Sequence, residues 1–76
     1  MIRELDTVVL MCDLPKYGLK EGDTGTVVLL HGDAGYGVEF MTFDGATIAV
    51  VSLTKDQVRA VGPGEVPHSR ALETRA

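Results

Sequence analysis

Few side chains in this chain have the type and spacing that chemistry requires. Its 76 residues include one cysteine, Cys12, and two histidines, His31 and His68. No second cysteine or histidine stands at metal-ligand spacing from any of them, so we expect no metal site. Cys12 alternates with Val8 and Leu10 and has no basic neighbour that would favour a thiolate, which predicts a packed thiol rather than a nucleophile. We therefore expect no catalytic residues and no cofactors.

Three aspartates, Asp23, Asp33 and Asp44, fall in expected turns. Such residues could meet at one end of a small domain and hold a cation. A turn aspartate accepts hydrogen bonds from nearby backbone N–H groups, however, and this explains each of them without a ligand. We expect structural turns at Asp23 and at the Asp44-Gly45 pair.

A loop with regularly placed glycines precedes the most apolar strand. Gly18, Gly22 and Gly25 are three and four residues apart, a spacing that suits a chain reversing twice. Leu19 is the one apolar side chain inside the loop, and we expect it to point inward. The loop lacks the glycine and lysine pattern of a phosphate-binding loop, and no helix follows it, so a structural role is favoured.

Alternating and β-branched apolar runs predict five short strands, at about residues 8–12, 26–30, 36–41, 47–53 and 58–61. Asp44-Gly45 predicts a type I′ hairpin turn between the third and fourth strands. Thr54 and Gln57 stand at capping-box spacing and predict one helical turn before the last strand. This order is that of an SH3-like barrel, an all-β fold whose closure protects the edge strands.

The chain divides into a barrel over residues 1–61 and a tail over residues 62–76. The tail begins with a Gly- and Pro-rich break and continues with mostly polar residues. We expect it to be flexible, either frayed or loosely helical.

Composition restricts the function classes. The net charge of −4 disfavours binding to nucleic acid or to an anionic membrane. A single cysteine and the lack of signal-peptide or membrane-span patterns indicate a cytoplasmic protein. Hydrophobic residues make up 45% of the chain and mean hydropathy is +0.14, which is apolar for so small a domain. We therefore expect self-association, as a homo-oligomer, or a protein partner.

Six stretches resemble, in order, the pattern of a bacterial family of short, mostly stand-alone domains of unknown function. They are ELDTVVL at 4–10, GDTGTVV at 22–28, VEF at 38–40, DG at 44–45, AVVSL at 49–53 and VR at 58–59. The resemblance covers residues 3–61 and implies a small SH3-like barrel. Its Gly-Asp-x-Gly-x-Val part also resembles the KOW motif of ribosomal and transcription-factor barrels. The resemblance carries over no catalytic residue.

Together these features predict a small, non-catalytic protein-interaction or oligomerisation module. The candidate binding residues are Tyr17, Leu19 and Lys20 in the loop and Tyr36 at a strand start, because SH3-like barrels bind peptides through aromatic surfaces. A second candidate surface is the outward set of Val28, Leu30 and Val50. The alternatives are a KOW-like barrel associated with nucleic acid and an accessory subunit of an enzyme.

Overall fold

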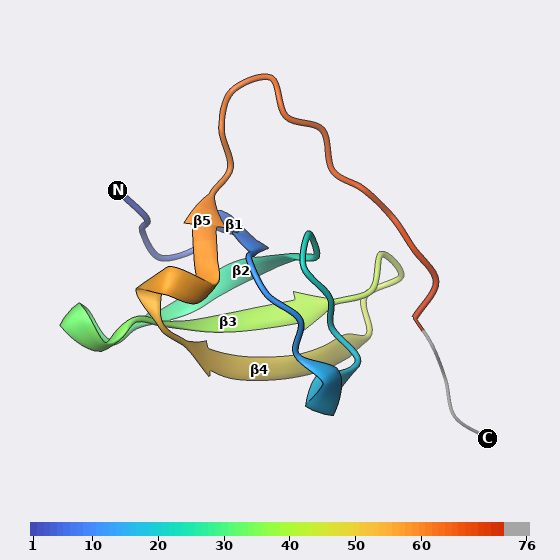
Figure 1. Cartoon of the computed structure of the whole chain (residues 1–76), viewed down its shortest axis with the longest axis horizontal. Coiled ribbons are helices and arrows are strands. Elements are labelled where there is room, and N and C mark those ends of the chain that lie inside the picture. The colour runs from blue at the N-terminus through green and yellow to red at the C-terminus, as the bar shows by residue number, and fades with distance from the viewer. Residues whose placement is uncertain (73–76) are drawn as a thin grey trace.

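A computed structural model describes residues 1–72, and residues 73–76 lie outside the described part. One antiparallel sheet contains five strands, β1 (Thr7–Leu10), β2 (Thr24–Leu30), β3 (Tyr36–Met41), β4 (Thr47–Leu53) and β5 (Val58–Ala60), in the order β4-β3-β2-β1-β5 (Figure 1). The helical elements of residues 1–72 are three 3-10 turns, η1 (Pro15–Tyr17), η2 (Gly32–Ala34) and η3 (Lys55–Gln57). No helix in this part of the chain could span a membrane. The predicted all-β fold is confirmed.

The inner face of the sheet carries the core because apolar residues alternate along its strands. Val38 on β3 faces Val27 on β2 and Val51 on β4, so one row of β-branched side chains crosses three strands. Phe40 and Leu10 are almost completely buried on the same face.

The loop over residues 11–23 covers part of this inner face. Leu14 and Leu19 exchange backbone hydrogen bonds, with N–O distances of 2.8 and 3.1 Å, which close the loop on itself. Leu10 ties the loop to β1, since its N–H donates to the Asp23 carbonyl and its carbonyl accepts from the Gly22 N–H. The side chain of Leu19 is only 2% exposed. The prediction that Leu19 points inward is confirmed.

The helical turn before the last strand is also confirmed. It is the 3-10 turn η3, and the side-chain Oε1 of Gln57 accepts the Thr54 N–H at 2.8 Å.

The prediction of a closed barrel is wrong. Closure would require β4 and β5, the two ends of the strand order, to pair with each other. Instead β5 has three residues and pairs only with β1, and within residues 1–72 no strand pairs with the far edge of β4. After Ala60 the chain leaves the sheet through a segment containing Pro63, which has no backbone N–H to donate to a ladder. The sheet therefore stays open.

The turn between β3 and β4 is a hairpin, but the predicted type I′ turn is wrong. Gly45 has a φ of +95°, whereas Asp44 is not among the residues with positive φ. The Gly45 N–H donates to the Thr42 carbonyl and the Thr42 N–H donates to the Ala46 carbonyl, at 3.0 and 2.8 Å. This loop is longer than a two-residue turn, and the register of the two strands shifts beyond Phe40.

The segment after β5 is extended over residues 65–72 and contains no helix or strand there. Arg59 and Glu65 form an ion pair at 2.8 Å near its start. The segment then arcs away from the sheet and returns at the side of the β3–β4 turn (Figure 1). There Arg70 contacts the glycine loop, residues 11–23, at Gly18 and Asp23. Within 62–72, the loosely helical form expected for the tail is not seen. Residues 73–76, the rest of the predicted tail, lie outside the described residues.

Gly35 provides a test of the packing between the β2–β3 turn and the end of β4. It is buried with a φ of +125°, and a Cβ built there would stand 2.1 Å from the Leu53 carbonyl oxygen. We expect Gly35→Ala to lower the free energy of unfolding, measured by urea denaturation, by at least about 3 kcal/mol.

Gly32 in the same turn is the matched control. Its φ is +61° and nothing lies within 4 Å of a Cβ built on it. Gly32→Ala should cost only about 1 kcal/mol, the ordinary penalty of the left-handed conformation. Equal losses in the two variants would contradict the described packing.

Candidate interaction surfaces

The outer face of the sheet exposes apolar side chains. Gly37 and Glu39 of β3 flank the buried Val38 and therefore lie on the outer side of the sheet. Leu29 of β2 pairs with Gly37 and Val50 of β4 pairs with Glu39, so Leu29 and Val50 lie on that outer side as well. Their side chains are 54% and 56% exposed. This outer apolar pair lies on either side of β3.

On β2 the outward residue in the structure lies one position away from the residues expected from the sequence, Val28 and Leu30. Val50 and Leu30 are exposed and Val28 is half-buried. A register shift between Val27 and Leu29 makes Leu29 the residue that faces Gly37, while Leu30 faces the inward-pointing Tyr36. A β-bulge of this kind changes the face on which the following residues lie, and apolar alternation alone does not reveal it.

The two edges of the sheet differ in character. β5 is short, includes Arg59, and is followed by the turn that Glu65 stabilises. β4 has seven residues, Thr-Ile-Ala-Val-Val-Ser-Leu, with no charge and no proline. Natural sheets usually protect their edges with charged residues, prolines, short strands or covering segments. In the described part of the chain, β4 has none of the first three and no strand pairs with its outer edge.

The four predicted binding residues differ in how much of each side chain is exposed. Tyr17 lies in η1, 36% exposed, with the Lys16 Nζ 5.8 Å from its ring centroid. Lys20 is exposed in the loop, and Tyr36 is half-buried against the core at the start of β3. Leu19 belongs to the core cluster and is only 2% exposed with residues 68–72 in place.

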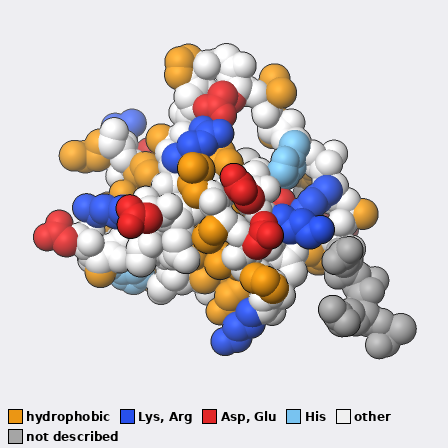
Figure 2. Space-filling view, viewed as in Figure 1, with side chains coloured by type: hydrophobic (Ala, Val, Ile, Leu, Met, Phe, Trp, Pro, Cys, Tyr) orange, Lys and Arg blue, Asp and Glu red, His pale blue; other side chains and the backbone are white. Residues whose placement is uncertain are grey.

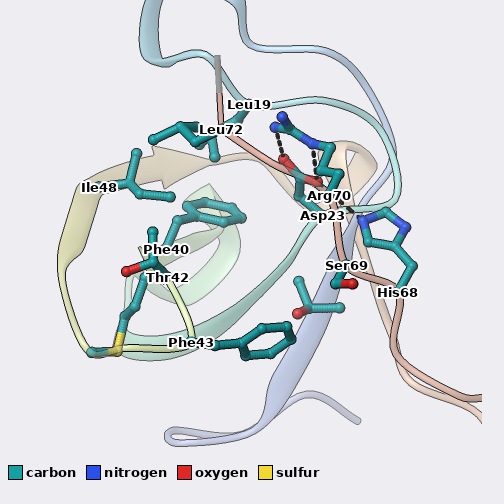
Figure 3. A pocket seen from close by; sticks show the side chains of 12 residues that line it. Leu19, Asp23, Phe40, Thr42, Phe43, Ile48, His68, Ser69, Arg70 and Leu72 are labelled. Atoms are coloured by element: carbon teal, nitrogen blue, oxygen red, sulfur yellow. Dashed lines mark hydrogen bonds and ion pairs between the residues drawn. The ribbon is translucent and has the colours of Figure 1, made fainter. Parts of the chain in front are cut away.

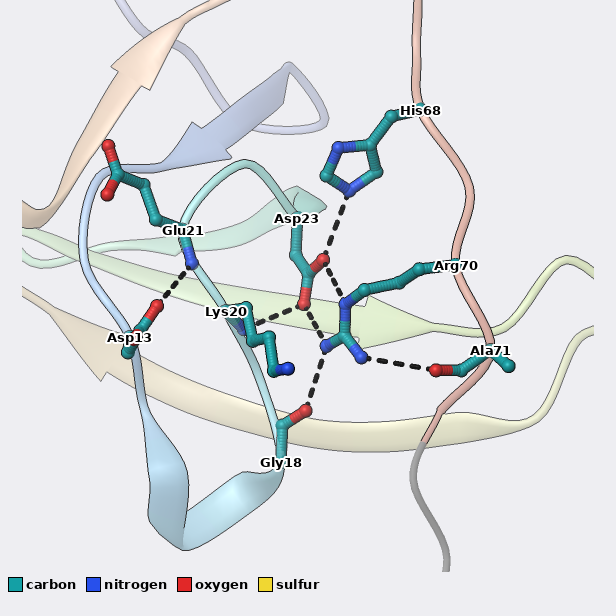
Figure 4. Close-up of polar contacts among 8 residues, drawn as sticks. All are labelled: Asp13, Gly18, Lys20, Glu21, Asp23, His68, Arg70 and Ala71. Atoms are coloured by element: carbon teal, nitrogen blue, oxygen red, sulfur yellow. Dashed lines mark hydrogen bonds and ion pairs between the residues drawn. The ribbon is translucent and has the colours of Figure 1, made fainter.

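A carboxylate in the glycine loop joins the loop to the segment after β5 (Figure 4). Asp23 is 9% exposed, and its Oδ2 accepts the Lys20 N–H at 2.9 Å. Arg70 donates to both carboxylate oxygens, from Nε to Oδ1 at 2.9 Å and from Nη2 to Oδ2 at 2.6 Å. His68 Nε2 lies 3.2 Å from Oδ1, and Arg70 Nη2 also donates to the Gly18 carbonyl at 2.8 Å. Asp23 is therefore a turn residue and an ion-pair acceptor at once.

The expected turn glycines have separate roles. Gly18 and Gly22 have φ values of +72° and +95° and lie in the loop. Gly25 instead lies inside β2, where a Cβ would stand 2.6 Å from Val38 Cγ1. This glycine allows close approach between strands rather than a turn.

A pocket of about 130 Å³ lies beside this ion pair (Figure 3). Its apolar lining comes from the loop, from β3, β4 and the turn between them, and from the segment after β5: Leu19, Phe40, Phe43, Ile48 and Leu72. His68 and Arg70 line its polar side. His68, Arg70 and Leu72 are two residues apart, so an extended segment directs all three toward the domain.

The acidic group at the centre of this arrangement has a perturbed pKa. Burial alone would raise the pKa of Asp23. The hydrogen bonds from Arg70, from the Lys20 N–H and from His68, together with the charge of Arg70, outweigh burial. The pKa of Asp23 is therefore lower than its ordinary value of 3.8. The carboxylate is thus ionised at neutral pH. Among residues 1–72 no group of three or more His, Cys, Asp or Glu could hold a metal ion.

His68 and Arg70 were not among the candidate residues from sequence. Both lie in a polar segment without periodic apolar residues, about 45 residues beyond Asp23 in the chain. The alternation of His68, Arg70 and Leu72 is the one available signal, and it is too short to identify a docked segment.

Asp23→Asn should change how stability depends on pH. A lowered folded-state pKa contributes stability above the unfolded-state pKa and loses it as pH falls through the folded value. We expect the free energy of unfolding of the variant to be about 1.5–3 kcal/mol lower than that of wild type at pH 7. This difference should shrink below about pH 4, where the wild-type carboxylate becomes protonated. Urea denaturation from about pH 2 to pH 7 measures both.

Asp33→Asn is the control for this series. The side chain of Asp33 is fully exposed, and its nearest cation, the Lys55 Nζ, is 3.8 Å away. An exposed pair of this kind contributes little, so the variant should follow the wild-type pH profile. An Asp23→Asn difference that stays constant across the pH range would contradict the role given to the carboxylate.

A family model described as a domain of unknown function (DUF4926) matches residues 4–60. The match confirms the resemblance to a short family of unknown function that the sequence motifs indicate. No curated protein and no solved structure matches the chain.

Proposed function

Since this chain belongs to the DUF4926 family, whose function is unknown, we propose from its geometry that it is a protein-interaction module that pairs with a second copy of itself through β4. The observation that carries the proposal is the free edge of β4, seven residues long and without charge or proline. Unpaired backbone N–H and C=O groups along such an edge are a template for another strand. Pairing satisfies these groups and removes the edge.

The sequence of β4 is compatible with two-fold self-pairing. Antiparallel pairing centred on Val50 overlaps all seven residues and places Val50 opposite the partner's Val50 on the outer face. Ala49 then faces the partner's Val51, and both residues point to the inner face, because each pairs with an inward residue of β3. The two strands carry no like charges to repel each other. A two-fold interface uses the same patch on both copies, as most soluble dimers do.

The exposed apolar side chains of the domain support this proposal. With 45% hydrophobic residues, the molecule leaves Leu29, Val50 and Phe43 largely exposed. Pairing at β4 covers Val50 and continues the outer face from one copy to the next. Against the nucleic-acid alternative stand the net charge of −4 and the mixture of acidic and basic side chains on the face in Figure 2.

The test is the solution mass of the chain by light scattering after size-exclusion chromatography, over a concentration series. We expect a dimer that dissociates on dilution. Val50→Lys places a charge on the edge strand, directly opposite its own copy, and should shift the midpoint of dissociation to at least about tenfold higher protein concentration.

Leu29→Lys is the matched control, because Leu29 is equally exposed on the same face but lies on β2, inside the sheet. It should leave the dissociation midpoint within about twofold of wild type, since an exposed charge away from the paired edge adds little. A monomer at every concentration would refute self-association. A dimer broken by Leu29→Lys but not by Val50→Lys would indicate stacking of outer faces and would refute pairing at β4.

A further inference from the structure

We propose that the groove beside Asp23 is a binding site for an extended polypeptide segment that carries an arginine followed two residues later by an aliphatic residue. In this chain the site is filled by its own residues 68–72. The proposal stands apart from pairing at β4, because it rests on the glycine loop and on the segment after β5.

The acceptors of the groove match a guanidinium group. The two oxygens of Asp23 accept from two nitrogens of Arg70, and the Gly18 carbonyl accepts a further hydrogen bond from the same side chain. A planar fork of donors reaches these acceptors from two nitrogens at once, a match that the single nitrogen of lysine does not reproduce. The chemistry therefore selects arginine over lysine.

The carboxylate is also held from within the domain, by hydrogen bonds that do not involve the docked segment. The Lys20 N–H holds Asp23 Oδ2 from inside the loop, and the Asp23 N–H donates to the Lys20 carbonyl at 3.0 Å. Lys20 and Asp23 both lie within the family domain, residues 4–60. A fixed carboxylate loses little freedom when it binds, which favours affinity.

The preference for an aliphatic residue two positions after the arginine comes from the adjoining pocket. Leu19, Phe40 and Ile48 line it from the domain, and Leu72 lines it from the docked segment. Leu72 Cδ1 is also 3.8 Å from the position of a Cβ built on Gly18. Phe43 also lines this pocket and is 86% exposed.

The site and its present occupant are separable parts of the chain. Asp23 and Gly18, which accept from Arg70 across the groove, and the apolar lining supplied by the sheet and loop lie within residues 4–60, whereas the docked residues lie beyond that range. Residues 61–67 connect the two parts without a helix or strand, and Val66 within them is 86% exposed. A tether of this length holds a segment at millimolar effective concentration, so the segment competes with a partner in trans. The chain's own segment thereby restricts access to the site.

The experiment uses the full chain with Arg70→Ala and a fluorescent peptide of sequence VPHSRAL, which repeats residues 66–72. Fluorescence anisotropy measures the dissociation constant. We expect saturable binding to the variant, and binding to wild type at least about tenfold weaker because its own segment fills the groove. Peptides with alanine or lysine in place of the arginine should bind the variant at least about tenfold more weakly, as should the probe to the Asp23→Asn/Arg70→Ala chain.

Three results would overturn the proposal. The first is equal binding of the arginine and alanine peptides. The second is no binding of the probe to a folded Arg70→Ala chain in which NMR shows the amides of residues 68–72 released. The third is an Arg70→Ala chain that is unfolded and that excess probe does not refold, since the segment would then be part of the fold in cis.

Discussion

The sheet stays open because β5 pairs with β1 and with no other strand. Three residues are enough to extend one edge, and the chain then leaves the sheet toward the glycine loop. The loop over residues 11–23 covers part of the inner face, with Leu19 as its anchor. The outer edge of β4 has no strand partner within the described residues, and the proposed protein-interaction role rests on this edge.

Asp23 connects β1, the glycine loop and the segment after β5. Its backbone carbonyl accepts from Leu10 on β1, its side chain accepts from Lys20 in the loop, and the same side chain binds Arg70 beyond β5. A buried carboxylate without these donors would be unfavourable, and with them it is ionised and fixed in place. Asp23 therefore shapes the glycine loop and also anchors the segment after β5 through Arg70.

Local patterns predicted much of the fold. The strands at 36–41 and 47–53 were predicted with their observed bounds, because alternation and β-branching report burial directly. Barrel closure was predicted wrongly, since it depends on strands that pair over a long stretch of chain. The hairpin at Asp44-Gly45 was predicted, but its turn type was not, since that type depends on the register shift beyond Phe40. The contact of Arg70 with Asp23 was not predicted for the same reason, because an ion pair between a loop and a polar segment leaves no periodic signal.

The most direct test of the central claim is amide hydrogen exchange in β4 across a series of protein concentrations. In an antiparallel pair, alternate residues direct their N–H groups to the neighbouring strand and the others direct them away. In dilute protein, pairing through β4 predicts that only the amides directed to β3 are protected, in an alternating pattern. In concentrated protein it predicts that the outward amides, those directed away from β3, are protected as well. Outward amides that exchange fast at every concentration would show that no second strand covers this edge, and would contradict the account.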